Sequence, residues 1–169
     1  MATITSRWRS MTAADIPVVD AIGVVVHPGF PEDIAVMENR FGLFGAGCFV
    51  ADNDDKAIGY AIAHPSKIGR PAPLNTVLPA LDANADCLFL HDIALTNAAR
   101  GQGLGVAIVP LLKNVARTHG FAKLGLVSVN NSRAFWSAQG FEILAGDDTL
   151  KAKLATYEDD ACFMVLDVG

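Results

Sequence analysis

An apolar segment that leads directly into a glycine-rich turn and a helix constrains the fold more than any other part of this sequence. Residues 87–95 have the composition of a buried strand, and glycines stand at positions 101, 103 and 105 of the turn that follows. Glycine lets the backbone bend tightly and approach a ligand closely. The helix expected over residues 103–119 begins here, and the N–H groups and dipole at a helix N-terminus favour a phosphate. The unit therefore predicts a pyrophosphate site.

The glycine spacing excludes two common kinds of phosphate site. A P-loop ends in Gly-Lys-Ser/Thr, whereas Val106 and Ala107 follow Gly105 here. A dinucleotide fingerprint has the spacing G-x-G-x-x-G, whereas this turn has G-x-G-x-G. A tight turn with no ligand remains the structural alternative.

The rest of the chain predicts one α/β domain over residues 1–169. Apolar periodicity and turn residues give the element order β-α-α-β-β-β-α-β-α-β-β, with a weak further helix before the last strand. The expected strands are 6–10, 48–51, 57–63, 87–95, 124–129, 141–144 and 161–168. The first expected helix starts after an N-cap at Thr12 and continues to 26, and the others are 32–41, 103–119, 132–139 and 150–157. The crossover from strand 87–95 through a helix to strand 124–129 makes the centre of a mixed sheet parallel, with helices flanking it. Residues 65–86 carry four prolines and are expected to form a long loop of the kind that often covers a binding site.

Composition narrows the classes of partner. The net charge of −5 and pI of about 5.2 argue against nucleic acid, which requires clustered Lys and Arg. No apolar run is long enough to span a bilayer, and the N-terminal residues lack the features of a secretory signal, so we expect a cytoplasmic protein with no membrane partner. Cys48, Cys87 and Cys162 lie far apart among apolar neighbours. They read as buried hydrophobic residues rather than as a nucleophile or zinc ligands, and no metal is expected.

Two segments resemble the GNAT superfamily of acyl-CoA N-acyltransferases. Its acyl-CoA loop has the pattern Arg/Gln-x-x-Gly-x-Gly/Ala, which Arg100, Gly103 and Gly105 match. Residues 129–141 are similar to its second signature, in which Asn131 and Ala134 precede an aromatic pair and then Gly-Phe.

This resemblance implies a GNAT-like fold and an enzyme that moves an acetyl group from acetyl-CoA to a primary amine by direct attack in a ternary complex. The acceptor would be a small-molecule or peptide amine, and homodimers are frequent among similar proteins. The residues that the resemblance assigns to acetyl-CoA binding are Ile93, Ala94, Leu95, Arg100, Gly101, Gln102, Gly103, Leu104, Gly105, Asn131 and Phe135.

His91 is the predicted general base, because a histidine with a pKa of about 6.5 can be neutral at physiological pH and similar enzymes carry a base at this point of the strand. Its alternative is a structural hydrogen bond. Asp92 is the second candidate, as base or as an orienting group, although alternation along a strand would point it to the opposite face from His91.

His27 and Phe30, in the turn between the first two helices, are predicted to contact the acceptor. Trp136 stands where the family usually has the tyrosine that protonates the leaving thiolate, and indole only donates hydrogen bonds. Trp136 is therefore expected to form a wall of the substrate pocket. The missing tyrosine also supports an alternative function, a catalytically silent acyl-CoA-binding regulatory module.

Overall fold

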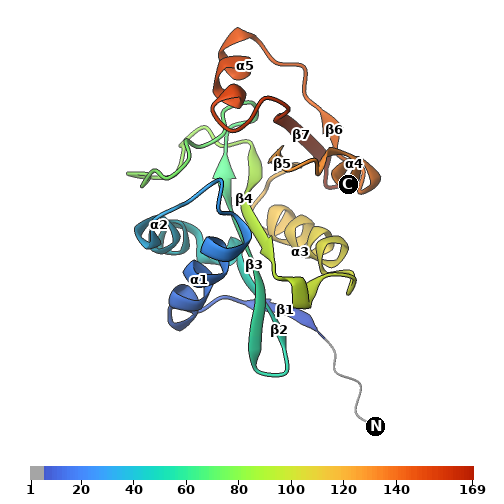
Figure 1. Cartoon of the computed structure of the whole chain (residues 1–169). Coiled ribbons are helices and arrows are strands. Elements are labelled where there is room, and N and C mark those ends of the chain that lie inside the picture. The colour runs from blue at the N-terminus through green and yellow to red at the C-terminus, as the bar shows by residue number, and fades with distance from the viewer. Residues whose placement is uncertain (1–5) are drawn as a thin grey trace.

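A seven-stranded mixed sheet with the strand order β1-β2-β3-β4-β5-β7-β6 forms the centre of the computed structural model (Figure 1). The structure describes residues 6–169. Residues 1–5 lie outside the described residues, and they include part of the N-terminal segment that was expected to lack a secretory signal. The strands are β1 (Arg7–Ser10), β2 (Cys48–Asn53), β3 (Lys56–Ser66), β4 (Cys87–Leu95), β5 (Lys123–Ser128), β6 (Glu142–Ile143) and β7 (Cys162–Asp167). The helices are α1 (Ile16–Val26), α2 (Ile34–Phe44), α3 (Leu104–Thr118), α4 (Arg133–Ala138) and α5 (Asp148–Ala155).

The predicted element order and the mixed α/β class are confirmed, with β4 and β5 forming the parallel pair. Several boundaries differ, and two of the differences have a clear physical reason. β3 continues through Pro65, which pairs with Leu88 of β4, so the long loop starts only at residue 67. α2 begins at Ile34 instead of Glu32, because Asp33 keeps an extended backbone and the Glu32 side chain pairs with His91.

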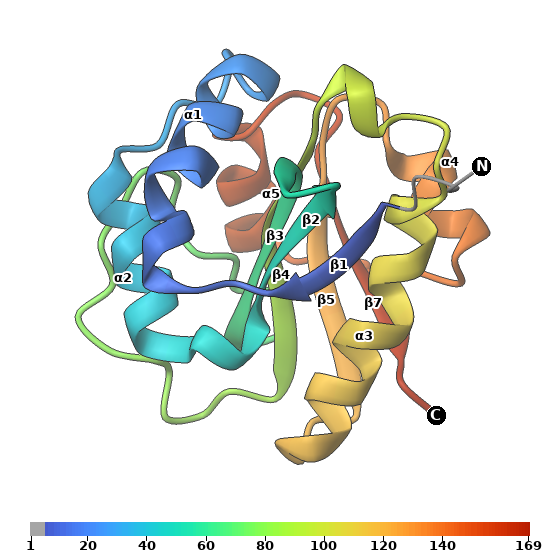
Figure 2. The same cartoon turned by 90° about the horizontal axis from the view of Figure 1, so that it is seen from below.

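Helices cover both faces of the sheet. α1, α2 and α5 pack on one face, and α3 and α4 pack on the other (Figure 2). The larger core cluster joins α3 to the sheet through Ile108, Leu112, Leu88 and Leu126, and a second cluster joins α1 and α2 to Tyr60 and Ile62 of β3, among other residues. Within residues 6–169, no helix combines the length and apolar character needed to cross a membrane.

β4 separates from β5 halfway along its length. The two strands pair only where Leu88–Leu90 lie beside Leu124–Leu126, so residues 91–95 of β4 extend past the last paired position. On its other side, β4 pairs with β3 throughout, but the register shifts between Ile62 and Ala63. Ile62 pairs with Asp92 and Ala63 pairs with Leu90, which leaves His91 as an extra, bulged residue.

Candidate active site

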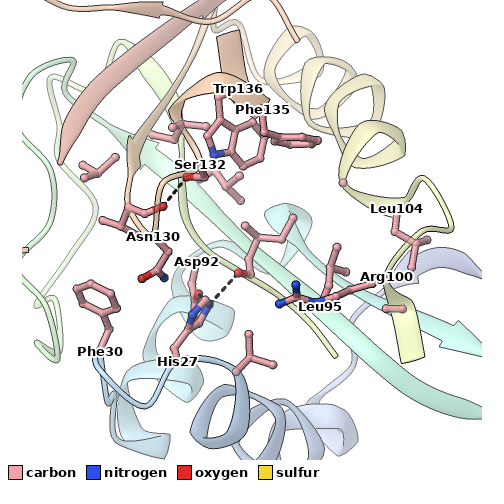
Figure 3. Close-up of a pocket in the computed structure, with 18 of the residues that line it drawn as sticks. His27, Phe30, Asp92, Leu95, Arg100, Leu104, Asn130, Ser132, Phe135 and Trp136 are labelled. Atoms are coloured by element: carbon pink, nitrogen blue, oxygen red, sulfur yellow. Dashed lines mark hydrogen bonds and ion pairs between the residues drawn. The ribbon is translucent and has the colours of Figure 1, made fainter. Parts of the chain in front are cut away.

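The point where β4 leaves β5 opens into a cleft of about 910 Å³ (Figure 3). Four segments line it: the α1–α2 connection, the free half of β4, the N-terminal turn of α3, and the segment from β5 into α4. The cleft brings together most of the residues predicted from the sequence, which are His27, Phe30, His91, Asp92, Ile93, Leu95, Arg100, Gly101, Gly103, Leu104, Gly105, Phe135 and Trp136.

The glycine-rich turn has the backbone that a close ligand contact requires. Gly101 and Gly103 adopt φ values of +77° and +73°. Apart from the two adjacent residues in the chain, no atom of the described part of the chain lies within 4 Å of a Cβ built at either position. Gly103 is the N-cap of α3, so the first N–H groups of this 15-residue helix open toward the cleft. The indole N–H of Trp8 donates to the Leu104 carbonyl at 2.9 Å and anchors the turn to β1. The arrangement suits a pyrophosphate.

Three of the residues predicted to bind acetyl-CoA lie outside the cleft lining. Gln102 turns its side-chain amide to the Ala98 carbonyl at 2.5 Å, and the Ala94 side chain packs into the core on the α1–α2 side. Asn131 is exposed, whereas its neighbours Asn130 and Ser132 line the cleft. The family resemblance implies that residues 93–95 contact acetyl-CoA through their backbone, so the prediction for Ala94 does not depend on its side chain.

The aromatic pair of α4 forms one wall of the cleft. Trp136 is 6 % exposed and packs edge to face on Phe135 and Phe141. Phe135 is 38 % exposed and approaches Gly105, where a Cβ would lie 3.0 Å from its ring. The glycine at position 105 therefore permits the contact between α3 and α4.

His27 belongs to a hydrogen-bonded chain at the centre of the cleft. Its Nε2 lies 2.8 Å from the Ile93 carbonyl oxygen and 3.1 Å from Asp92 Oδ1 (Figure 3). The buried Tyr60 hydroxyl donates to the other oxygen of Asp92 at 2.5 Å. Burial lowers the pKa of His27, but the hydrogen bond and charge of Asp92 and the Ile93 carbonyl outweigh it, so the pKa is raised above its usual range.

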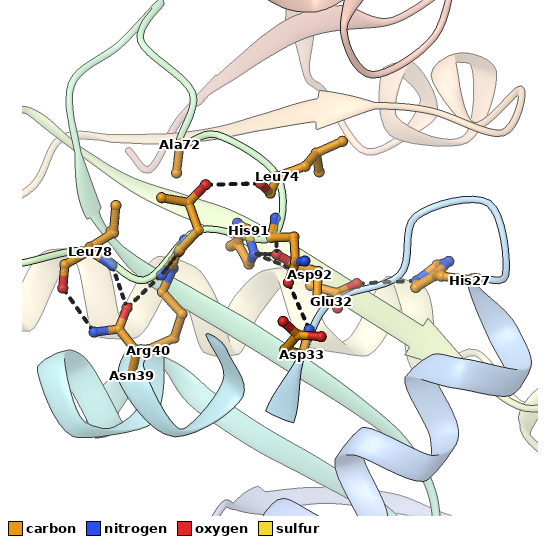
Figure 4. Close-up of polar contacts among 12 residues, drawn as sticks. His27, Glu32, Asp33, Asn39, Arg40, Ala72, Leu74, Leu78, His91 and Asp92 are labelled. Atoms are coloured by element: carbon orange, nitrogen blue, oxygen red, sulfur yellow. Dashed lines mark hydrogen bonds and ion pairs between the residues drawn. The ribbon is translucent and has the colours of Figure 1, made fainter. Parts of the chain in front are cut away.

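His91 forms a second histidine–carboxylate pair with the same loop. Its Nε2 lies 2.9 Å and 3.1 Å from the two oxygens of Glu32, and its side chain is only 2 % exposed (Figure 4). The expectation that His91 and Asp92 point to opposite faces is wrong. The bulge at His91 interrupts the alternation of β4, so both side chains reach the α1–α2 connection.

Sequence reasoning gave no role to Tyr60 or Arg40, and it considered Glu32 only as a further contact for the acceptor amine beside His27. Glu32 is one of many acidic residues, and only the fold shows that it meets a histidine 59 positions away. Tyr60 carried a weak signal, because a tyrosine in an apolar strand needs a buried partner for its hydroxyl.

A sequence model described as the acetyltransferase (GNAT) family matches residues 14–141, most of the chain. The protein therefore belongs to the GNAT family of acyl-CoA-dependent acyltransferases. A comparison with curated proteins of known function found no match.

Solved structures with the same fold belong to proteins with different activities. N-acetylglutamate synthase from Neisseria gonorrhoeae, in complex with coenzyme A and N-acetyl-glutamate, aligns with a TM-score of 0.73 and 16 % identity. The alignment covers 99 % of this chain but only 36 % of the synthase chain. The GNAT-like decarboxylase GphF, in complex with isobutyryl-CoA, has a TM-score of 0.75 and 14 % identity, covering 96 % of this chain and 100 % of its own. The ribosomal-protein-S18-alanine N-acetyltransferase from Escherichia coli aligns with a TM-score of 0.68 and 19 % identity, and the alignment covers 98 % of this chain and 95 % of the acetyltransferase chain. At these identities the likeness is one of fold.

Proposed function

We propose that the protein transfers an acetyl group from acetyl-CoA to a primary amine. The observation that carries this proposal is the convergence, in one cleft, of the glycine-rich N-terminus of α3, the free edge of β4 and the His27–Asp92 pair. The structural neighbours that hold coenzyme A or isobutyryl-CoA support acyl-CoA binding in this cleft, and the neighbour that acetylates a protein alanine supports transfer to an amine.

The chain supplies separate groups for holding and activating acetyl-CoA. Gly101, Gly103 and the first N–H groups of α3 would hold the pyrophosphate, with Arg100 beside them. The backbone of β4 beyond Leu90 would bind the pantetheine arm, because β5 does not pair with it there. A backbone N–H of this segment, at Ile93 or a neighbour, would stabilise the thioester oxygen as negative charge develops on it.

We assign the role of general base to His27. Two oxygens that can accept a hydrogen bond, the Ile93 carbonyl oxygen and Asp92 Oδ1, lie near Nε2 of its ring. Nε2 therefore carries the proton, and Nδ1 is the basic nitrogen of the neutral ring. Nδ1 would take the proton that the acceptor ammonium loses before or during attack on the thioester. Asp92 would stabilise the resulting imidazolium, and Tyr60 fixes the orientation of Asp92.

The assignment differs from the sequence-based choice of His91, which remains the competing proposal. His91 is nearly enclosed and both oxygens of Glu32 lie at its Nε2, whereas the side chain of His27 is 19 % exposed in the cleft. A base must be within reach of the proton that it removes, which favours His27.

Trp136 leaves the departing thiolate without a tyrosine from α4. A thiol pKa of about 8.5 makes the thiolate a tolerable leaving group, which water can protonate after departure. Trp136 then acts as a wall of the pocket, in keeping with its packing against Phe135 and Phe141.

The decisive experiment follows the release of the CoA thiol from acetyl-CoA in the presence of a panel of primary amines. We expect acetyl-CoA to bind and at least one amine to give turnover above the rate of thioester hydrolysis. Binding of acetyl-CoA without turnover across polyamines, amino acids and peptide N-termini would favour the silent acyl-CoA-binding module instead.

A further inference from the structure

Next to the cleft, the loop of residues 67–86 covers a group of buried polar side chains (Figure 4). Arg40 of α2 is 0 % exposed and His64 of β3 is 1 % exposed. The rings of His64 and His91 are 5.9 Å apart, and His91 continues the group to Glu32. Apart from His91, which also lines the cleft, the proposed acetyl transfer gives these side chains no role.

Arg40 makes hydrogen bonds on one side of its guanidinium only. Nη1 donates to Asn39 Oδ1 at 2.6 Å and to the Thr76 carbonyl of the loop at 2.9 Å. Nε and Nη2 are both buried and have no hydrogen-bond partner within the described residues. These two nitrogens form one edge of the planar guanidinium, where two parallel N–H bonds match the two oxygens of a carboxylate.

The buried positive charge of Arg40 also lacks a carboxylate in contact. Glu32 is committed elsewhere, because it accepts from the backbone N–H of Asn75 at 3.0 Å and both of its oxygens lie at His91 Nε2. Among residues 6–169, no carboxylate oxygen lies within 4.0 Å of the Arg40 guanidinium nitrogens. His64 adds no competing charge, because burial lowers its pKa to about 4 and the ring stays neutral. An enclosed cation of this kind is strongly stabilised by a bound anion.

Polar contacts hold the loop against the rest of the fold. Asn75 binds Glu32 and Asp33, Asn39 binds Leu78, and the Tyr157 hydroxyl donates to the Ala72 carbonyl. His91 joins this buried group to the cleft, because it lines the cleft and its ring neighbours that of His64.

We propose that the vacant Nε/Nη2 edge of Arg40 binds a carboxylate of the acceptor, so that the amine substrate is an amino acid or another amine that carries a carboxylate. The inference rests on the proposed acetyl transfer and specifies its substrate class. Because both nitrogens are buried, the proposal requires the loop of residues 67–86 to move aside when the carboxylate binds.

The test compares acceptors that differ only in the carboxylate: alanine, alaninamide and ethylamine, and phenylalanine, phenylalaninamide and phenethylamine. We expect kcat/KM of the wild-type enzyme to be at least about 100-fold higher for the free amino acid in at least one series, because an unpaired buried donor is left when the carboxylate is missing. In Arg40→Met this preference should disappear while the rate with the carboxylate-free amine is retained. Arg70→Met, which changes an exposed arginine of the same loop, is the matched control and should keep the preference.

A second measurement does not depend on the variant folding. Propionate should inhibit the wild-type enzyme competitively against the acceptor, and propionamide should not. The inference would be overturned if amines are turned over with no preference for a carboxylate, or if the preference survives in Arg40→Met. The proposed acetyl transfer would still stand in either case, and the vacant edge would hold a buried water only. If no amine is turned over, the proposed acetyl transfer fails, and a thermal shift of the wild type with propionate but not propionamide still decides the carboxylate site.

Discussion

Two histidine–carboxylate pairs link the loop between α1 and α2 to β4, and the loop supplies the histidine of one pair and the carboxylate of the other. In one pair the loop supplies the histidine, His27, and the strand supplies Asp92; in the other the loop supplies Glu32 and the strand supplies His91. The first pair faces the cleft and the second is enclosed, so the same chemical groups are suited to proton transfer in one place and to holding the loop in the other.

The His27 assignment predicts a specific pH profile. His27 is an effective base only when neutral, so kcat/KM should rise with pH and level off above a pKa that is higher than that of a free histidine. His27→Gln should remove this limb and lower the rate by about 10²- to 10⁴-fold. Asp92→Asn should move the limb to lower pH, since burial then acts on His27 without the opposing carboxylate.

His91→Gln serves as the matched comparison, because it changes the other histidine on the same loop–strand contact. The pH profile should keep its limb in this variant even if KM for the acceptor rises. A limb that survives in His27→Gln and vanishes in His91→Gln would return the role of base to His91.

At the residue scale, the sequence could identify histidines near the end of an apolar strand but could not rank them. The ranking depends on the bulge at His91, and the shift in the pairing of β3 with β4 that creates it leaves no local signature in the sequence. The vacant edge of Arg40 was equally hidden, because it results from what the residues around α2 do not supply.

At the scale of elements, the turn before α3 was predictable because its glycines have a local cause. Gly101 and Gly103 need left-handed backbone, and this need is visible in the sequence without knowledge of the rest of the fold. The separation of β4 from β5 was implied only by the family resemblance, since residues 91–95 taken by themselves are as compatible with a fully paired strand as with a free edge.

The turn offers a direct test of acetyl-CoA binding. Acetyl-CoA at about 100 times its dissociation constant should stabilise the wild-type fold by roughly 2.7 kcal/mol. Gly103→Glu should abolish this gain, because it places bulk and negative charge where the pyrophosphate is expected. Gly103→Asn is the control: asparagine tolerates left-handed backbone and adds no charge, so most of the gain should remain. An undiminished thermal shift in Gly103→Glu would place the ligand elsewhere.

At the scale of the whole molecule, the buried His64 and the partly buried His27 make the stability of the ligand-free protein depend on pH in opposite directions. The folded-state pKa of His64 is lowered by burial to about 4, so unfolding takes up a proton at pH values between there and about 6.5. Its contribution is therefore complete above pH 6.5 and is lost as the pH falls. The pKa of His27 is raised, so its contribution is present below about pH 6.5 and is lost as the pH rises through the folded value.

These opposite signs predict that stability is greatest near pH 6.5 and declines on both sides. Between pH 6.5 and 5, where few carboxylates titrate, one proton taken up by His64 costs at most about 1.4 kcal/mol per pH unit. Urea unfolding at pH 5.0, 5.75 and 6.5 measures this slope, and His64→Asn, which cannot titrate, should flatten it. His119→Asn, at the exposed C-terminal end of α3, should leave the slope as in the wild type. If the free energy of unfolding has the same pH slope in the wild type and in His64→Asn, water reaches His64 in the folded protein. The buried polar group beneath the loop of residues 67–86 would then be open to solvent without a substrate.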